Sequence, residues 1–157
     1  MSEAKIGAWS GADLLILSCS GSSDVGEIAD QTARSLARDG VGKTYWLTGI
    51  GGRIARTVKT AQAADQILAI DGCTRNCASL CLKEAGFEGF ATLRLAELGM
   101  EKGMCPATEE SVARAAETAR AVLAAQRHRD WPRQEAAIPF VDRRPQVLTD
   151  NGFRMRH

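Results

Sequence analysis

Three cysteines recur every four residues in the segment Cys73-Thr-Arg-Asn-Cys77-Ala-Ser-Leu-Cys81. On a helix, residues four apart lie on the same face, so this spacing brings thiols together. A fourth cysteine, Cys19, follows a short apolar run, as Cys73 does. The thiolate is both a nucleophile and a ligand for soft metal ions. Cysteines gathered where strands end therefore indicate metal or redox chemistry rather than packing.

A distance argument restricts which thiols can bind one ion. On a continuous helix, residues i and i+8 lie ~12 Å apart along the axis, whereas zinc binds sulfur at ~2.3 Å. Cys73 and Cys81 can share an ion only if Cys73 lies in a loop and the helix begins near Asn76. Cys77 then occupies the first turn and Cys81 the second, with Asn76 or Thr74 as a candidate cap.

The elements that position these thiols alternate between strand and helix along the chain. Short apolar runs predict strands at Leu14–Ser18, Tyr45–Thr48, Ile67–Ile70 and Phe90–Leu95. Helical patterns separate them, at 25–39, at 54–64 and from the cysteine segment to Ala85, and a long Ala-rich pattern starts at Pro106 and ends near Gln126. Parallel strands joined by right-handed crossovers follow from this alternation. We predict a three-layer Rossmann- or flavodoxin-like α/β domain, with helices on both faces of a short parallel sheet.

The predicted topology brings distant cysteines to one edge. With strand order 2-1-3-4, the first and third strands are neighbours, and ligands bind at the carboxyl ends of such strands. Cys19 ends the first strand and Cys73 follows the third, while Cys105 precedes the last helix at the same edge. Cys19, Cys73 and Cys77 are the stronger predicted ligands. Cys81 is either the fourth ligand or a small buried residue beneath the site.

The chain as a whole predicts one domain over 1–126 and an irregular arm over 127–157. The 157 residues are 45% hydrophobic, which is sufficient for a core. Pro132, Pro139 and Pro145 interrupt the arm, which we expect to pack on its own domain or on the partner subunit of a homo-oligomer. The alternative for the arm is a largely disordered tail.

Charge and hydropathy exclude several partners. A net charge of +1 gives no argument for nucleic acid or an anionic membrane, and no apolar stretch approaches the ~20 residues that cross a bilayer. Ile16-Leu-Ser-Cys19 resembles a lipoprotein cleavage site, but the acidic residues upstream and the short apolar run argue against a secretory signal. We therefore expect a cytoplasmic protein, in which five reduced cysteines favour metal binding or reactivity over disulfides.

Several apparent motifs fail on context. Gly40-Val-Gly-Lys-Thr44 ends a helix instead of starting one, unlike a phosphate-binding loop, and Gly49-Ile-Gly-Gly-Arg53 lacks the third glycine of a dinucleotide loop. A cysteine phosphatase needs an arginine six residues after its nucleophile, but Val25 and Ser79 occupy those positions. Both histidines, His128 and His157, fall in the predicted arm.

Asp71-Gly72-Cys73, with Cys77 and Cys81, and the upstream segment Ser18-Cys19-Ser-Gly-Ser-Ser-Asp-Val-Gly26 together resemble the DGC-motif family. Thr48-Gly-Ile-Gly-Gly52 is also similar to its pattern, and the resemblance runs from about Asp13 to Ala124. The family is described as zinc-binding through four cysteines, which implies Cys19, Cys73, Cys77 and Cys81 as metal ligands here. The resemblance supplies a ligand set and not a reaction.

The expected function is that of a cytosolic zinc-binding protein. Four thiolates make a closed tetrahedral site, and three leave a position open for water or substrate. Thiolate softness also admits Cu(I) or an iron–sulfur cluster. The alternative is a thiol enzyme in which Cys19 or Cys73 is the nucleophile or redox centre and Cys77 resolves. Asp71 is either a turn residue, a group that orients a ligand, or a general base.

A third class of function is an interaction module. In that case the predicted arm over 127–157 would dock a partner, and shortening the chain after Gln126 would change its assembly state.

Overall fold

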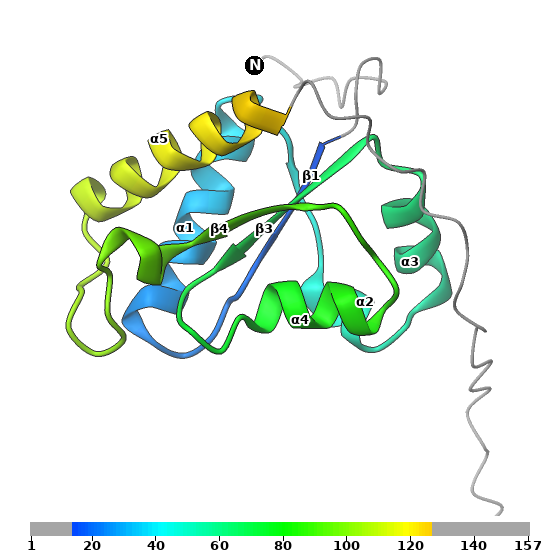
Figure 1. The fold of residues 1–157 in the computed structure, drawn as a ribbon, viewed down its shortest axis with the longest axis horizontal. Helices are drawn as coiled ribbons and strands as arrows, with labels where there is room; N and C mark the ends of the chain where they lie inside the picture. Colours follow the sequence, from blue (N-terminus) through cyan, green and yellow to red (C-terminus); the bar gives the residue numbers. More distant parts are fainter. Residues whose placement is uncertain (1–13, 127–157) are drawn as a thin grey trace, which may run out of the picture.

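The computed structural model describes residues 14–126 (Figure 1). In chain order its elements are β1 Leu14–Ser18, α1 Asp24–Arg38, β2 Lys43–Thr44, α2 Leu47–Gly51, α3 Ala55–Gln62, β3 Gln66–Asp71, α4 Cys77–Glu84, β4 Ala91–Arg94, a 3₁₀ helix Leu95–Leu98 and α5 Glu109–Gln126. The predicted arm over 127–157 lies outside the described residues. No helix within 14–126 has the length and apolar character to cross a membrane.

The four strands form one parallel sheet in the order β2-β1-β3-β4, which confirms the predicted order. β1 pairs along its whole length with β3, from Leu14 opposite Gln66 to Ser18 opposite Ile70. Every residue of β1 is buried, as are all but the first of β3. Strands without a solvent-facing side are expected when helices cover both faces of a parallel sheet.

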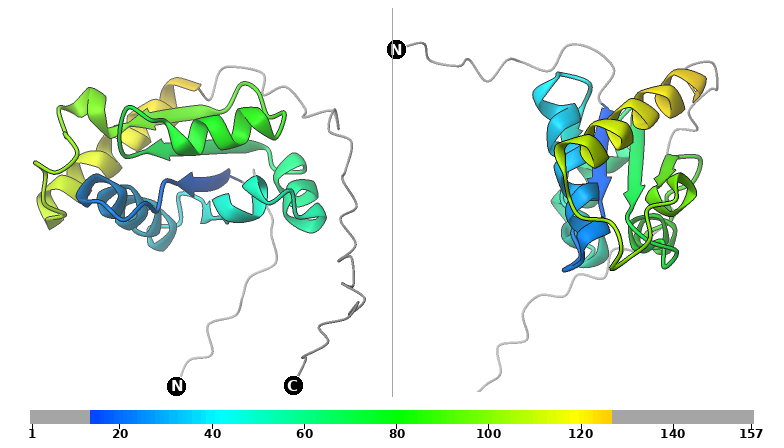
Figure 2. Two further views of the ribbon diagram at one scale, coloured as in Figure 1. Left: turned by 90° about the horizontal axis from the view of Figure 1, so that it is seen from below. Right: turned by 90° about the vertical axis from the view of Figure 1, so that its left-hand side faces the viewer.

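Helices cover both faces of the sheet, so the α/β three-layer class is also confirmed. Alternate residues of β1 and β3 pack under α1 and α5 on one face, as Ile16 and Leu68 do. The intervening residues, such as Leu17 and Ala69, pack under α3 and α4 on the other. Figure 2 shows the strands lying between α1 and α4. Crossovers that diverge in this way from β1 and β3 leave a switch point between the two strands.

Side chains at the helix starts explain where α1 and α5 begin. Ser23 Oγ accepts the Gly26 N–H at 3.2 Å at the start of α1. Thr108 Oγ1 accepts the Ser111 N–H at 3.2 Å in the same way at the start of α5. These bonds satisfy amides that a helix leaves unpaired in its first turn. Serine and threonine are among the residues that most often cap the start of a helix.

The second strand is the element that the sequence places wrongly. We predict it at Tyr45–Thr48, but β2 is Lys43–Thr44, and the chain leaves the sheet after the Tyr45 N–H donates to the Ile16 carbonyl. Leu47–Gly51 forms the short helix α2, which overlaps the end of the predicted strand. Close packing of α2 on α3 requires a small residue there, because a Cβ on Gly49 would lie 2.8 Å from Thr57 Cγ2.

Candidate cysteine site

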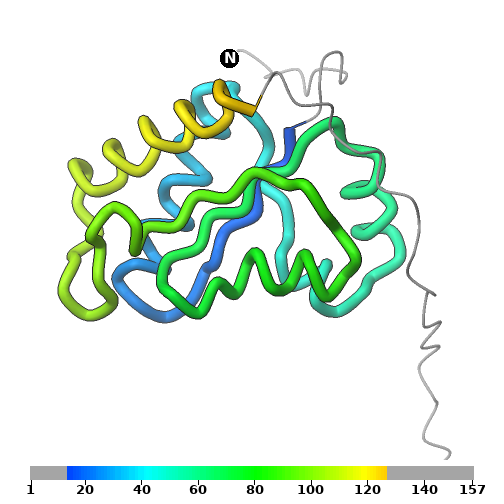
Figure 3. Tube along the Cα trace, viewed as in Figure 1, coloured from blue at the N-terminus to red at the C-terminus, as the bar shows by residue number. Residues whose placement is uncertain are grey.

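The turns that leave β1, β3 and β4 lie at one edge of the molecule (Figure 3). Cys19 directly follows β1, Cys73 lies in the β3–α4 turn and Cys77 is the first residue of α4. The Cys19 N–H donates to the Ile70 carbonyl at 2.9 Å, so the pairing of β1 with β3 extends to the first cysteine. The predicted loop position of Cys73 and first-turn position of Cys77 are both confirmed.

Cys77 lies within electrostatic range of three other cysteines, Cys19, Cys73 and Cys81. Burial raises the pKa of the Cys77 thiol first, and interactions with Cys19, including a hydrogen bond, raise this pKa further. Smaller contributions come from Cys73 and Asp71. Negative charges that approach one another in this way disfavour ionisation of the thiol. The structure therefore places Cys19, Cys73 and Cys77 at the same edge, after two neighbouring strands.

Two glycines allow this approach of the β1 and β3 turns. A Cβ on Gly72 would lie 2.7 Å from the Val25 carbonyl oxygen, so only glycine lets the β3–α4 turn lie against the first turn of α1. Gly26 faces the backbone of Gly21, and a Cβ there would lie 2.9 Å from the Gly21 carbonyl carbon. The glycine that follows Asp71 therefore has a packing role that places Cys73 beside the Cys19 turn.

Asp71 fixes the start of α4. Its buried carboxylate accepts the Ala78 N–H at 2.7 Å, the Ser79 N–H at 3.3 Å and a short hydrogen bond from the Ser79 hydroxyl. These are amides that the helix itself leaves unpaired, and the negative charge lies at the positive end of the helix dipole. Of the three roles considered for Asp71, the contacts show a helix cap that orients Cys77.

The predicted caps of α4 are therefore wrong. Asn76 occupies the position before the helix but makes no side-chain cap bond, and its backbone is left-handed, with φ of 51°. Asparagine tolerates this conformation better than most residues. Asn76 Oδ1 is buried without a hydrogen-bond partner in the described residues. Asp71 at the end of β3 performs the capping that we expected from Asn76 or Thr74.

Cys81 lies one turn beyond Cys77 on α4 and faces α2. Its thiol donates to the Leu47 carbonyl at 3.6 Å, and a Cβ on Gly51 would lie 3.2 Å from its sulfur. Burial is the main cause that raises the pKa of Cys81, followed by the charge of Cys77. Both predicted roles of Cys81, ligand or packing residue, are compatible with this position.

Asp24 is a residue that the sequence analysis did not single out. Its carboxylate accepts N–H bonds from Gly103 at 2.8 Å and from Cys105 at 2.9 Å, as well as from the adjacent Val25. These backbone hydrogen bonds lower the pKa of Asp24. Asp24 thus ties the loop before α5 to the start of α1. The sequence does carry a signal for an electrostatic role of Asp24, because it is an acidic residue in the first turn of a helix.

Across residues 14–126, no three Cys, His, Asp or Glu side chains are arranged as a metal-binding group. Both histidines, His128 and His157, lie outside this range. The cysteines are free thiols, and those of Cys19, Cys73 and Cys81 each interact electrostatically with Cys77.

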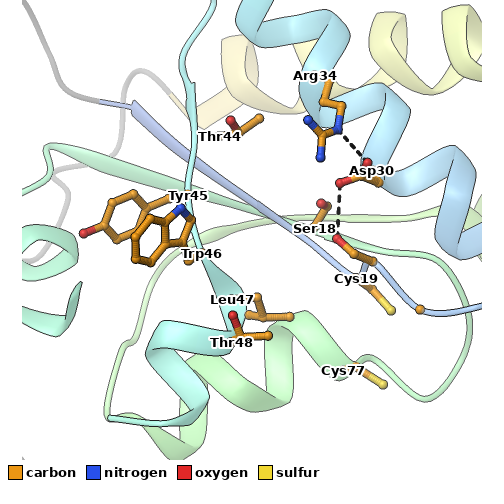
Figure 4. Close-up of a pocket in the computed structure, with 12 residues that line it drawn as sticks. Ser18, Cys19, Asp30, Arg34, Thr44, Tyr45, Trp46, Leu47, Thr48 and Cys77 are labelled. Carbon is orange, nitrogen blue, oxygen red and sulfur yellow. Dashed lines mark hydrogen bonds and ion pairs between the residues drawn. The ribbon is translucent and has the colours of Figure 1, made fainter. Parts of the chain in front are cut away.

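A cleft of about 590 Å³ adjoins the cysteines. It is lined by residues 18–21 after β1, by Asp30 and Arg34 of α1, by residues 44–48 and by Cys77. Figure 4 shows the Cys19 and Cys77 sulfurs at one side and the rings of Tyr45 and Trp46 at the other. Clefts of this volume are typical of small-molecule sites.

Comparison with known proteins agrees with the motif. A family model described as the DGC domain matches residues 15–121, from β1 into α5. The chain belongs to the DGC domain family. The anaerobic and virulence modulator AnvM of Pseudomonas aeruginosa is 33% identical over 88 residues, which are 56% of this chain and 67% of AnvM. No solved structure matches the chain. Membership confirms the resemblance predicted from the DGC tripeptide and its neighbouring cysteines.

Proposed function

We propose that this DGC-domain protein binds zinc through the thiolates of Cys19, Cys73 and Cys77, with Cys81 as the fourth ligand. The observation that carries the proposal is that Cys19 follows β1 whereas Cys73 and Cys77 follow its neighbour β3, so all three lie at the same carboxyl edge of the sheet. Zinc prefers tetrahedral sulfur ligands. Thiols that repel one another as anions are stabilised when a cation lies between them.

The surrounding residues suit a metal centre. Asp71 holds the start of α4 and so restricts the position of Cys77, while Gly72 holds the turn that carries Cys73. Groups that orient metal ligands commonly contribute to metal affinity, and their replacement weakens metal binding. Cys81 approaches from the second turn of α4 and would complete a closed site, whereas its exclusion would leave one position open.

The alternative is a thiol enzyme with Cys19 or Cys73 as its reactive thiol, and two observations disfavour it. A reactive thiol needs cationic groups or free helix amides that lower its pKa. The Ala78 and Ser79 amides of α4 are instead bonded to Asp71. Residues 14–126 also contain no histidine to serve as a base.

We further propose a regulatory or metal-handling role in a reducing compartment, the cytoplasm. AnvM is named as a modulator and not as an enzyme. Thiolate centres are sensitive to oxidation, which suits a relative named as an anaerobic modulator.

Elemental analysis of anaerobically purified protein tests the proposal. We expect one zinc per chain and thiols that react with a titrating reagent only after chelation. Replacing Cys19, Cys73 or Cys77 by serine should abolish zinc retention, whereas Cys105→Ser, outside the proposed ligand set, should retain it. Metal-free protein with a fast-reacting thiol would instead support the thiol enzyme. A zinc content unchanged in Cys77→Ser would also contradict the proposal.

The same measurement separates the two roles of Cys81. If Cys81 is the fourth ligand, Cys81→Ala should lose zinc as the other variants do. If it only packs beneath the site, Cys81→Ala should keep one zinc per chain with reduced thermal stability, because a half-buried sulfur contact with α2 is lost.

A further inference from the structure

The cleft beside the cysteines contains a cationic group whose terminal nitrogens face the open space. Arg34 Nε donates to Asp30 Oδ2 at 2.7 Å, which holds the guanidinium in place. Figure 4 shows the other two nitrogens of Arg34 directed away from Asp30, one toward the side of Thr44 and one toward Ser18. A planar guanidinium held by one edge retains a second edge for a bidentate bond to an oxyanion.

Both oxygens of Asp30 are engaged, and its carboxylate leaves the second edge of the guanidinium unoccupied. Oδ2 accepts from Arg34, and Oδ1 accepts the Ser20 hydroxyl at 3.2 Å. The charged pair is neutral overall, which suits a singly charged carboxylate better than a dianion. Hydroxyl groups of Ser18 and Thr44 line the same wall and can donate further hydrogen bonds.

The opposite wall presents an aromatic face. Trp46 is 68% exposed although its indole is large and apolar. It stacks on Tyr45 with ring centroids 6.4 Å apart and planes inclined by 15°. Such a pair offers a rigid flat surface on which a planar ligand can stack. Exposed apolar groups in a cleft with convergent polar groups indicate a binding site.

The helix ends near the cleft do not offer a competing anion site. At the start of α1, the Val25 N–H is bonded to Asp24 and the Gly26 N–H to Ser23. At the start of α4, the Ala78 and Ser79 amides are bonded to Asp71. Among the residues that line the cleft, Arg34 therefore supplies the positive charge for an anion.

We propose that the cleft binds a small aromatic carboxylate, with its carboxylate on Arg34 and its ring against Trp46. This ligand would lie beside Cys19 and Cys77. The inference goes beyond the proposed function, because recognition by Arg34 and Trp46 does not require the metal. The carboxylate would be held between α1 and β2, and the zinc between β1 and β3.

Titration with 2-naphthoate, followed by calorimetry and NMR, tests the proposal. We expect the uncharged isostere 2-naphthamide to bind at least about tenfold more weakly, because a charge-assisted hydrogen bond to Arg34 is lost. Arg34→Gln should weaken naphthoate binding by about tenfold as well, without changing the affinity for naphthamide. Arg38→Gln, an exposed arginine one turn further along α1, is the matched control and should bind naphthoate as the parent protein does.

The aromatic wall has its own control pair. Trp46 and Ile54 are exposed apolar residues directly before α2 and α3, and neither makes a side-chain cap bond. Trp46→Ala should weaken binding of both probes by about fivefold or more, since stacking on an aromatic ring is lost. Ile54→Ala, outside the cleft, should leave both affinities unchanged.

Equal affinity for naphthoate and naphthamide would overturn the proposal, as would equal losses in Arg34→Gln and Arg38→Gln. Absence of binding at millimolar naphthoate would also overturn it. Zinc content is measured on every sample, so the two proposals can fail separately. Naphthoate binding by zinc-free protein would support the carboxylate site while contradicting the metal site, and zinc-loaded protein without binding would show the reverse.

Discussion

At the scale of single residues, the site depends on two glycines as much as on its thiols. Gly26 and Gly72 lie where the β1–α1 and β3–α4 turns touch, and neither position has room for a Cβ. In most helices glycine is a poor choice, because it costs roughly 1 kcal/mol relative to alanine. The presence of Gly26 near the start of α1 is explained by the close approach of the Gly21 backbone in the preceding turn.

Gly26→Ala should therefore destabilise the protein, against the usual effect of this change in a helix. Overlap with the Gly21 carbonyl group should cost about 1–3 kcal/mol of unfolding free energy, which exceeds the gain in helix propensity. Chemical denaturation measures the difference. Gly21→Ala is the control, because its Cβ would meet Cys19 Sγ at an ordinary 3.5 Å. A Gly26→Ala protein as stable as its parent would contradict this packing.

Asp24 links stability to pH. Hydrogen bonds from the backbone of Gly103, Cys105 and Val25 lower its pKa in the folded protein. A group whose folded pKa is depressed contributes stability above its unfolded pKa of about 3.9, and this contribution is lost as pH falls through the folded value. Asp24→Asn should thus be less stable than its parent at neutral pH, with the difference shrinking below about pH 4.

Unfolding free energies measured between acidic and neutral pH test this expectation. Glu117→Gln removes an exposed carboxylate on α5 and should leave the pH profile unchanged. A gap between Asp24→Asn and its parent that stays constant down to the lowest pH would show that the Asp24 charge does not hold the loop before α5.

At the scale of elements, α4 depends on a residue outside itself. Asp71 ends β3, and its carboxylate bonds the Ala78 and Ser79 amides of the following helix. One side chain therefore joins the sheet, the start of α4 and the position of Cys77. Because the group is buried, any replacement that leaves those donors without an acceptor carries the full cost of desolvation.

Asp71→Asn should destabilise the protein by about 2 kcal/mol, since an amide cannot accept all the hydrogen bonds that the carboxylate accepts. Hydrogen exchange should accelerate at residues 77–80 before it changes in α5. Asp39→Asn, which removes an exposed carboxylate paired with Arg120, is the control and should change stability by less than about 1 kcal/mol. Unchanged exchange at the start of α4 in Asp71→Asn would contradict the capping role.

The elements that the sequence predicts well are those with a local physical signal. Buried apolar runs identify β1 and β3, and the distance limit on Cys73 and Cys81 correctly places the start of α4. The prediction of β2 is wrong because its two residues pair with a single neighbouring strand. The end of β2 also depends on the close contact of Gly49 with Thr57, which the sequence does not reveal. The cap by Asp71 and the Asp24 bonds are also missed, because each joins residues that the fold alone brings together.

At the scale of the molecule, the proposed ligands come from segments that only the folded sheet unites. Cys19 follows β1, whereas Cys73 and Cys77 follow β3, and α1, β2, α2 and α3 lie between them in the chain. An unfolded chain has no preformed arrangement of these thiols. The free energy of metal binding should therefore appear as stability of the whole domain.

Zinc should accordingly raise the stability of the metal-free protein. A ligand at 100 times its Kd that binds only the folded state adds about 2.7 kcal/mol to the unfolding free energy. For a domain of this size that corresponds to a rise in Tm of roughly 10 °C. Thermal unfolding of chelated, reduced protein with and without zinc measures the shift, and magnesium, which thiolates bind poorly, is the control ion.

Variants of the cysteines after β1 and after β3 separate zinc binding at the proposed site from effects of zinc bound elsewhere. Cys19→Ser and Cys73→Ser should each lose most of the zinc-dependent rise in Tm, because each removes a ligand from a different strand. Cys105→Ser should keep it, since Cys105 is joined to the fold through its backbone bond to Asp24. An equal rise in all three variants would place the zinc elsewhere, and no rise in the parent would contradict a metal centre that links β1 to β3.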